Sequence, residues 1–143
     1  MTIDTKYIDK FIEITSKAAL AASYLVGKKD KIAADKAAVD SMRSELNKIN
    51  IDAKIVIGEG ELDKAPMLYI GEKLGTKNGP KFDLAVDPLE GTNFAANNLP
   101  GALSVIAVTE KNNLFNAPET YMDKIAVGTN IPKDVIDLDF SVK

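Results

Sequence analysis

Four acidic side chains lie at or just after the ends of the helices and strands that the sequence predicts, next to glycine or proline in most cases. They are Asp35, Glu59, Asp87 and Glu90. Loops at strand ends are places where a rigid sheet can gather acids at one point. Carboxylates packed together raise one another's pKa and need a divalent cation between them. The pattern therefore indicates a site for a hard cation.

The segment VDPLEGTN carries two of these acids. Pro88 fixes one backbone dihedral and Gly91 frees another, so Asp87 and Glu90 can face one point. Backbone amides around Gly91 and Thr92 could then hold a phosphate oxygen in a loop or at a helix start. Taken alone, the segment equally fits an ordinary proline-glycine turn in which Thr92 caps a helix.

The segment IGEGELD places Glu59 between two glycines, which let a backbone turn sharply and approach a ligand closely. Each candidate also has a simpler interpretation. Glu59 and Asp63 fit solvated surface acids, and Asp35 fits a helix cap. Lys31 lies in a run of charged residues of the kind usually exposed to solvent, and Tyr121 fits a half-buried position at the edge of a core. The order of the motifs along the chain favours a shared site.

The composition excludes several kinds of chemistry. The 143 residues contain no histidine and no cysteine. This removes the Ser-His-Asp triad, the commonest transition-metal ligand, disulfides and thiol catalysis. Any bound metal must be held by oxygen, which points to magnesium, manganese or calcium. A net charge of −3 argues against nucleic acid as a partner.

The sequence has no apolar run long enough to span a bilayer, and its first residues, MTIDTKYIDK, lack the pattern of a signal peptide. We therefore expect a cytoplasmic protein with no membrane partner. A chain of this length, 45% hydrophobic, supports one domain with a small core.

Hydrophobic periodicity predicts two helices followed by strands. Apolar residues recur at helical spacing from Thr5 to about Val26 and again from about Ala33. A third helix is expected over 65–75, with Pro66 at its start. The predicted strands are 53–57, 82–86, 102–108, 124–128 and 135–139. The arrangement indicates an α/β (α+β layered) fold with a helix layer on a mixed sheet.

These ordered motifs resemble those of the lithium-sensitive, metal-dependent sugar-phosphatase superfamily, which includes inositol monophosphatases and fructose-1,6-bisphosphatases. Most of its branches have Asp-Pro-hydrophobic-Asp-Gly-Thr/Ser, and here Glu90 replaces the second aspartate. With the block VIGEGELDKAPMLYIGEKLG, the glutamate form is similar specifically to the class II fructose-1,6-bisphosphatases of bacteria. The likeness includes ALAASYLVGKKDK, AADKAAVDSMR, ALSVIAV and FNAPETYMDKIAVG, and so covers almost the whole chain.

The resemblance implies a set of ligands for Mg²⁺ or Mn²⁺. These are Asp35, Glu59, Asp87, Glu90 and the carbonyl of Leu89, with Asp87 bridging. It also implies that Thr92 orients or deprotonates the attacking water and that Asp35 holds this threonine. Asp63 would lie beside the metals. Lys31, Gly91, Thr92 and Tyr121 would approach the substrate phosphates.

The same resemblance implies metal-dependent hydrolysis of the 1-phosphate of fructose 1,6-bisphosphate, giving fructose 6-phosphate and phosphate in gluconeogenesis. Residues 1–143 would form one metal-binding domain, the N-terminal half of the αβαβα fold, without the C-terminal substrate half. Two alternatives stay open. One is a non-catalytic truncated or split-gene fragment acting as a metal-binding or assembly module. The other is an inositol-phosphatase-like enzyme for another sugar phosphate. An uncovered sheet edge predicts a homo-oligomer or a C-terminal partner half.

The chain departs from the pattern of the family it resembles at three positions and in length. Lys36 follows Asp35 where the family usually has glycine. Asn98 and Gly101 stand where glycine and asparagine are expected, so the loop after Thr92 is expected to follow a different path. The chain is also much shorter than family members and resembles only their N-terminal half.

Overall fold

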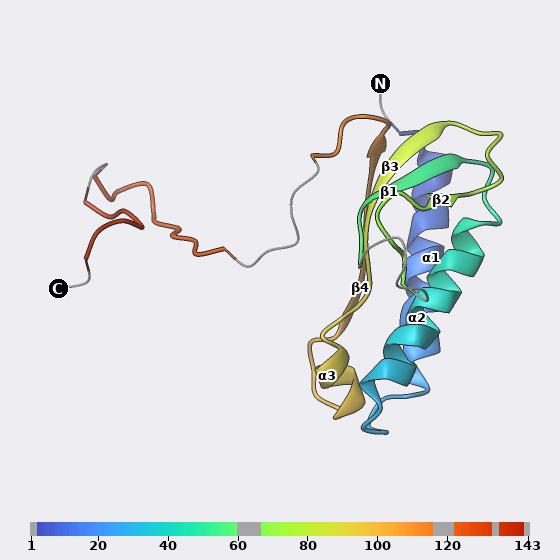
Figure 1. Cartoon of the computed structure of the whole chain (residues 1–143), viewed down its shortest axis with the longest axis horizontal. Helices are drawn as coiled ribbons and strands as arrows, with labels where there is room; N and C mark the ends of the chain where they lie inside the picture. The colour runs from blue at the N-terminus through green and yellow to red at the C-terminus, as the bar shows by residue number, and fades with distance from the viewer. Residues whose placement is uncertain (1–2, 60–66, 116–121, 133–134, 142–143) are drawn as a thin grey trace.

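The computed structural model describes residues 3–59, 67–115, 122–132 and 135–141. In this part of the chain, two helices lie against one face of a four-stranded sheet (Figure 1). The helices are α1 (Thr5–Ser23), α2 (Lys31–Leu46) and the short α3 (Thr92–Ala96). The strands are β1 (Asp52–Ile57), β2 (Lys73–Leu74), β3 (Lys81–Glu90) and β4 (Leu103–Glu110). The expected fold class, a helix layer on a mixed sheet, is confirmed.

The strand order is β2-β1-β3-β4. β1 pairs parallel with β3, whereas β2 and β4 pair antiparallel with β1 and β3. In the β3–β4 ladder Asp87 lies opposite Val105, and the register shifts between Asp87 and Glu90. Within the described residues β4 therefore forms one edge of the sheet, next to the strand that carries the DPLE motif.

The core lies between the two long helices and the sheet. α1 buries Phe11, Ile14, Ala18 and Ala22 at helical spacing. On β3, Phe82 makes edge-to-face contacts with the rings of Tyr7 and Phe11, with centroids 5.5 and 6.1 Å away. Alternate residues of a strand point to opposite faces, so this contact fixes which face of β3 meets the helices.

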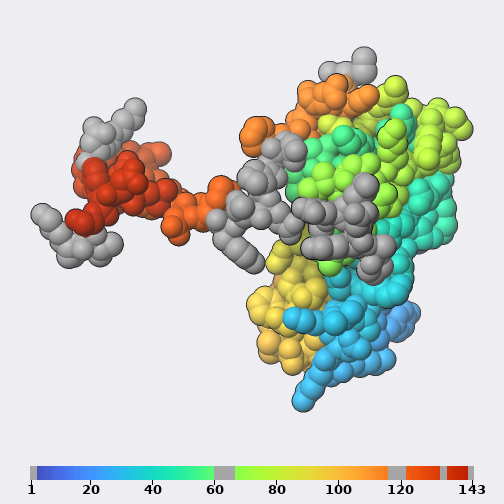
Figure 2. Space-filling model, in the orientation of Figure 1, coloured from blue at the N-terminus to red at the C-terminus, as the bar shows by residue number. Residues whose placement is uncertain are grey.

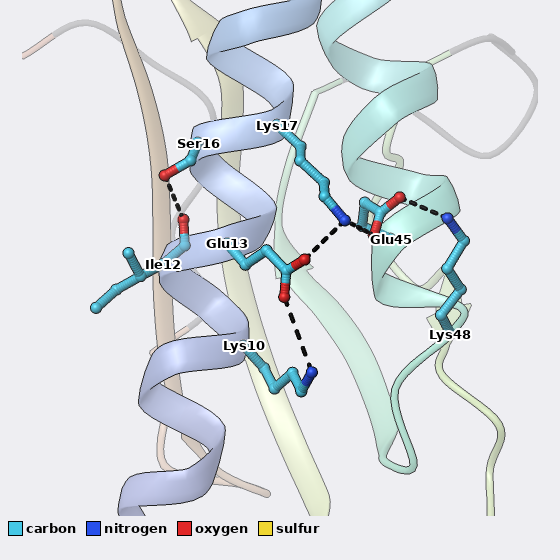
Figure 3. Close-up of polar contacts among 7 residues, drawn as sticks. All are labelled: Lys10, Ile12, Glu13, Ser16, Lys17, Glu45 and Lys48. Atoms are coloured by element: carbon cyan, nitrogen blue, oxygen red, sulfur yellow. Dashed lines mark hydrogen bonds and ion pairs between the residues drawn. The ribbon is translucent and has the colours of Figure 1, made fainter.

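An ion-pair network joins α1 to α2 on the exposed side (Figure 3). Lys17 Nζ lies 2.8 Å from Glu13 Oε1 on its own helix and 2.8 Å from Glu45 Oε2 on α2. Lys48 pairs with the other oxygen of Glu45, and Lys10 lies 3.8 Å from Glu13. Exposed pairs of this kind contribute little individually, so the buried faces account for most of the helix packing.

α2 begins two residues earlier than the periodicity predicts because Asp30 caps it. The Asp30 carboxylate accepts a hydrogen bond of 2.9 Å from the Ala33 amide. This cap satisfies a backbone donor of the first turn. Asp35 consequently lies in the second turn of the helix, which corrects the expectation that it stands at the helix start.

The expected helix over 65–75 is wrong for its described residues, which form turns and strand β2 from Met67 onward. Gly71 and Gly75 have φ angles of +94° and +89°, which an α-helix does not contain. Arg43 of α2 holds this segment instead. Its guanidinium donates to the Met67 carbonyl and, at 2.8 Å, to the Glu72 carboxylate.

The expected strands at 124–128 and 135–139 are also wrong. The described residues from 122 to 141 contain no helix or strand and stand clear of the sheet, orange to red in Figures 1 and 2. Their large apolar side chains are exposed: Met122, Ile125, Val127, Ile131, Val135, Ile136, Leu138 and Phe140. A strand requires a neighbouring strand for its backbone hydrogen bonds, and this stretch has none in the described part of the chain.

Candidate functional site

Three of the expected metal-ligating carboxylates interact where β1 and β3 end. β3 continues through the DPLE motif, so Asp87 and Glu90 lie inside the strand, which corrects their expected place after it. Glu59 follows β1, and because β1 and β3 are parallel their carboxyl ends lie at the same end of the sheet. The carboxyl of Asp87 interacts with those of Glu59 and Glu90.

The surroundings raise the pKa of Asp87 to about 6. Burial is the largest cause, because desolvation disfavours the charged carboxylate. Glu90 adds to the rise through its hydrogen bond and its negative charge. The hydrogen bonds with Glu59 and with the Leu89 amide lower the pKa and offset part of the rise. The group therefore holds a proton more readily than an isolated aspartate.

A second set of expected site residues lines an open pocket of about 360 Å³. Lys31 and Asp35 reach it from α2, and Thr92 reaches it from the first position of α3. Burial raises the pKa of the Asp35 carboxyl. The pocket therefore combines a cation, an acid and a hydroxyl, the three groups expected to meet substrate or water.

Two buried carboxylate oxygens, Asp35 Oδ1 and Asp87 Oδ1, have no hydrogen-bond partner. Such an atom is costly unless it receives a hydrogen bond or coordinates a cation. Both are hard oxygen donors of the kind that Mg²⁺ and Mn²⁺ prefer. The donor chemistry thus fits a divalent cation. Among residues 3–59, 67–115, 122–132 and 135–141, however, no three acidic side chains are already arranged to hold one.

Gly58 positions Glu59 by allowing a close approach within the protein. A Cβ at this residue would lie 2.4 Å from the Leu68 carbonyl oxygen and 2.6 Å from Ile55 Cγ2. The Glu59 amide donates a 3.0 Å hydrogen bond to that same carbonyl. The sequence predicts that the glycines beside Glu59 allow a close approach to a ligand. At Gly58 the absence of a side chain instead allows close packing against the Leu68 backbone.

The loop that carries Thr92 keeps glycine-type geometry at both departing positions. Gly91 precedes α3 in the left-handed conformation, with φ 78°. Asn98 has φ 56°, a conformation that asparagine tolerates better than most residues, and Gly101 has φ 106°. α3 is also tied to the end of α1, because the Gly27 and Lys29 amides donate to carbonyls of α3 at 3.0 and 2.8 Å.

The third departing residue, Lys36, pairs with Asp40 one turn along α2, although it also lines the pocket. Leu89, the expected carbonyl ligand, is buried. Asp63 and Tyr121 lie outside the described residues. Sequence reasoning missed Arg43 and Glu72, which anchor the 67–72 segment beside the pocket. The signal was available, because Arg43 is the only arginine in the chain.

Comparison with known proteins identifies similar sequences along most of the chain. The profile of the family described as bacterial fructose-1,6-bisphosphatase, glpX-encoded, matches residues 5–143. The class 2 fructose-1,6-/sedoheptulose 1,7-bisphosphatase of Synechococcus sp. (strain CC9902) is 52% identical over 124 residues, 87% of this chain and 37% of that protein. Fructose-1,6-bisphosphatase 1 class 2 of Escherichia coli (strain K12) is 52% identical over 130 residues, 91% of this chain and 38% of that protein.

The chain thus spans little more than a third of the length of these relatives, less than the half expected from its sequence. Among solved structures, an extragenic suppressor from Pyrococcus furiosus matches with a TM-score of 0.47 and 18% identity. That match covers 75% of this chain and 41% of the other.

Proposed function

Because this chain belongs to the family of bacterial, glpX-encoded fructose-1,6-bisphosphatases, we propose that it supplies the metal-binding part of a phosphatase site. The proposed reaction is hydrolysis of the 1-phosphate of fructose 1,6-bisphosphate to fructose 6-phosphate and phosphate, a step of gluconeogenesis. Residues 1–143 would act as one metal-binding domain. The proposed partners are a second copy of the chain, or a polypeptide equivalent to the part of the relatives that the chain does not span.

The observation that carries this proposal is the pair of buried, unpartnered oxygens on Asp35 and Asp87. Mg²⁺ or Mn²⁺ would be held by these two acids together with Glu59, Glu90 and the Leu89 carbonyl. The pKa of Asp87 is raised mainly by burial and then by Glu90, and a bound cation would offset both effects because it favours the charged carboxylate. When bound, such a cation acts as a Lewis acid that stabilises charge on the transferring phosphoryl group.

The remaining roles belong to the pocket beside α2 and α3. Asp35 would accept a hydrogen bond from Thr92 Oγ1, and this hydroxyl would orient the attacking water. Lys31 Nζ would offset phosphate charge, and the backbone of Gly91 and Thr92 would contact a phosphate oxygen. The shared lining of one pocket by Lys31, Asp35 and Thr92 supports this assignment. Roles for Asp63, in water activation, and Tyr121, in phosphate binding, rest on the family resemblance.

A cytoplasmic location belongs to the same proposal, because sugar bisphosphates of central metabolism are found there. No helix of the described residues is both long and apolar enough to cross a bilayer.

Calorimetric titration with MnCl₂ tests the ligand set. The wild-type chain should bind Mn²⁺, and Asp87→Asn and Glu90→Gln should each weaken binding by roughly tenfold or more, because each removes a charged ligand oxygen. Asp9→Asn is the matched control, since Asp9 is an exposed acid on α1. A folded wild-type chain that takes up neither Mn²⁺ nor Mg²⁺ would refute the proposal.

A phosphate-release assay with Mn²⁺ tests the reaction. Fructose 1,6-bisphosphate should be hydrolysed in preference to inositol monophosphate, either by the chain alone or after addition of the remaining part of a family member. Asp87→Asn should abolish the signal. Metal binding without phosphate release in either arrangement would contradict catalysis and leave a binding module.

A further inference from the structure

The edge of the sheet at β4 forms a groove with α1 that is apolar and open. The groove has a volume of about 600 Å³, and its walls include Ile8, Phe11 and Ile12 of α1 and Ser104, Val105 and Ile106 of β4. We call it the β4 groove. Phe11 belongs to the core, but Ile8 and Ile12 are 47% and 58% exposed, so α1 presents a second apolar row beside the sheet edge.

From Leu103 to Val108, β4 lacks the features by which edge strands usually avoid pairing with another strand. Residues 103–108 read LSVIAV and contain no charge and no proline. An exposed edge of this kind is a template for a further strand. The unpaired edge points to an occupant that brings backbone hydrogen-bonding groups, and the apolar walls of the β4 groove point to one that brings apolar side chains.

The same chain contains a segment with these properties. Residues 124–127 read KIAV, and Ile125 and Val127 alternate as on one face of a strand. Their side chains are 47% and 53% exposed, and the segment stands clear of the sheet in Figure 1. In the single chain this segment does not pair with the β4 edge, and the strand that the sequence predicts here does not form (Figure 1).

We propose that residues 124–127 of one copy pair with the β4 edge of a second copy, with Ile125 or Val127 inserted into the β4 groove. Every chain carries both the groove and the segment. A two-fold exchange therefore fills two grooves at once and closes the assembly as a dimer. The inference sharpens the proposed self-association and does not depend on the phosphatase chemistry.

Light scattering after size exclusion, at chain concentrations between about 1 and 100 µM, gives the first test, because an association depends on concentration. The wild-type chain should show a dimer that dissociates on dilution. A chain that stays monomeric at the highest concentration would overturn the proposal. It would indicate that the segment folds back on its own edge or that another polypeptide covers the groove.

Matched lysine variants give the second test. Ile12→Lys alters the groove, and Leu20→Lys is its control, at 58% and 55% exposure on the same helix. Ile125→Lys alters the segment, and Ile131→Lys is its control, at 47% and 43% exposure. The first variant of each pair should weaken dimerisation by roughly tenfold or more, because it places a charge in the buried contact, and the controls should not. Circular dichroism checks that all four remain folded.

Mixing the two disruptive variants separates this exchange from dimerisation through another surface. The Ile12→Lys chain keeps a normal segment, and the Ile125→Lys chain keeps a normal groove. A mixture should therefore form heterodimers with one intact contact and associate more strongly than either variant alone. Equal weakness of the mixture and the separate variants would overturn the segment-in-groove arrangement.

Discussion

At the scale of single residues, the raised pKa of Asp87 makes the stability of the folded chain depend on pH. Its pKa is raised to about 6, mainly by burial and then by Glu90. The folded state therefore binds this proton more tightly than the unfolded state, in which the pKa is near 3.8. The contribution of Asp87 to the free energy of unfolding is fully present below pH 3.8 and is lost as the pH rises through about 6.

This linkage predicts a pH-dependent effect of Asp87→Asn in the absence of divalent cations. Because the amide cannot ionise, the variant should become more stable relative to wild type as the pH rises from about 4 to 6, and the difference should then level off. Urea unfolding of both proteins at several pH values measures it. A stability difference that does not change with pH would contradict the raised pKa.

The gathering of Glu59, Asp87 and Glu90 could be predicted from the motifs, but their placement could not. Proline and glycine around these acids indicate a turn, whereas Pro88 is buried inside β3 where the ladder changes register. Proline cannot donate an amide to the ladder, and it is tolerated here because the ladder is irregular between Asp87 and Glu90. Asp35 lies within α2 because Asp30 is the better cap, a competition between two acids that helical periodicity does not resolve.

At the scale of elements, a buried ion pair replaces the expected third helix. The guanidinium of Arg43, on α2, lies 2.8 Å from the Glu72 carboxylate and also donates to the Met67 carbonyl. The side chain of Arg43 is 25% exposed and that of Glu72 is 11% exposed. The apolar residues of 65–75 fit a helical stripe in the sequence alone. Tertiary contacts and two left-handed glycines override that pattern, whereas α1 and α2 follow their periodicity because their apolar faces pack on one sheet.

Truncation of this arginine should therefore destabilise the fold. Arg43→Ala should lower the free energy of unfolding by roughly 2–3 kcal/mol, because it leaves the buried Glu72 carboxylate short of its partner. Lys10→Ala, which removes an exposed pair with Glu13, should leave it close to the wild-type value. Equal effects of the two changes in a urea titration would count against a structural role for Arg43.

The strand end that carries Glu59 offers a separate test. Gly58→Ala should destabilise the fold by about 1–3 kcal/mol, because the new Cβ would displace the Leu68 backbone. Gly128→Ala is the control, since a Cβ there meets nothing within 4 Å. The melting temperature should fall for the first variant and stay near wild type for the second. A normal melting temperature for Gly58→Ala would contradict the close approach.

At the scale of the whole molecule, the described residues form one helix layer on one sheet, with apolar side chains exposed on β4, on α1 and in residues 122–141. The helix layer could be predicted from apolar residues at helical spacing, and the central strands from short β-branched, apolar segments. The missing strands at 124–128 and 135–139 could not, because strand formation depends on an edge supplied elsewhere and not on local sequence alone.

A cation that binds only the folded chain should stabilise the molecule as a whole. At Mn²⁺ concentrations of about a hundred times the dissociation constant, the wild-type free energy of unfolding should rise by about 2.7 kcal/mol. Differential scanning fluorimetry with and without Mn²⁺ follows this as a higher melting temperature. Asp87→Asn, which should bind Mn²⁺ at least tenfold more weakly, should lose about half of this stabilisation or more. A shift equal to that of wild type would exclude Asp87 as a ligand.

The pairing of Asp87 with Val105 joins the acids to the exposed edge strand. Association at β4 and cation binding at Asp87 would thus act on facing residues of one ladder. If either event alters the other, the coupling must be reciprocal: Mn²⁺ would change the dimer dissociation constant by the same factor by which dimerisation changes the affinity for Mn²⁺. Dimerisation and cation binding would then be linked through one thermodynamic cycle, so a measurement of either one would report on the other.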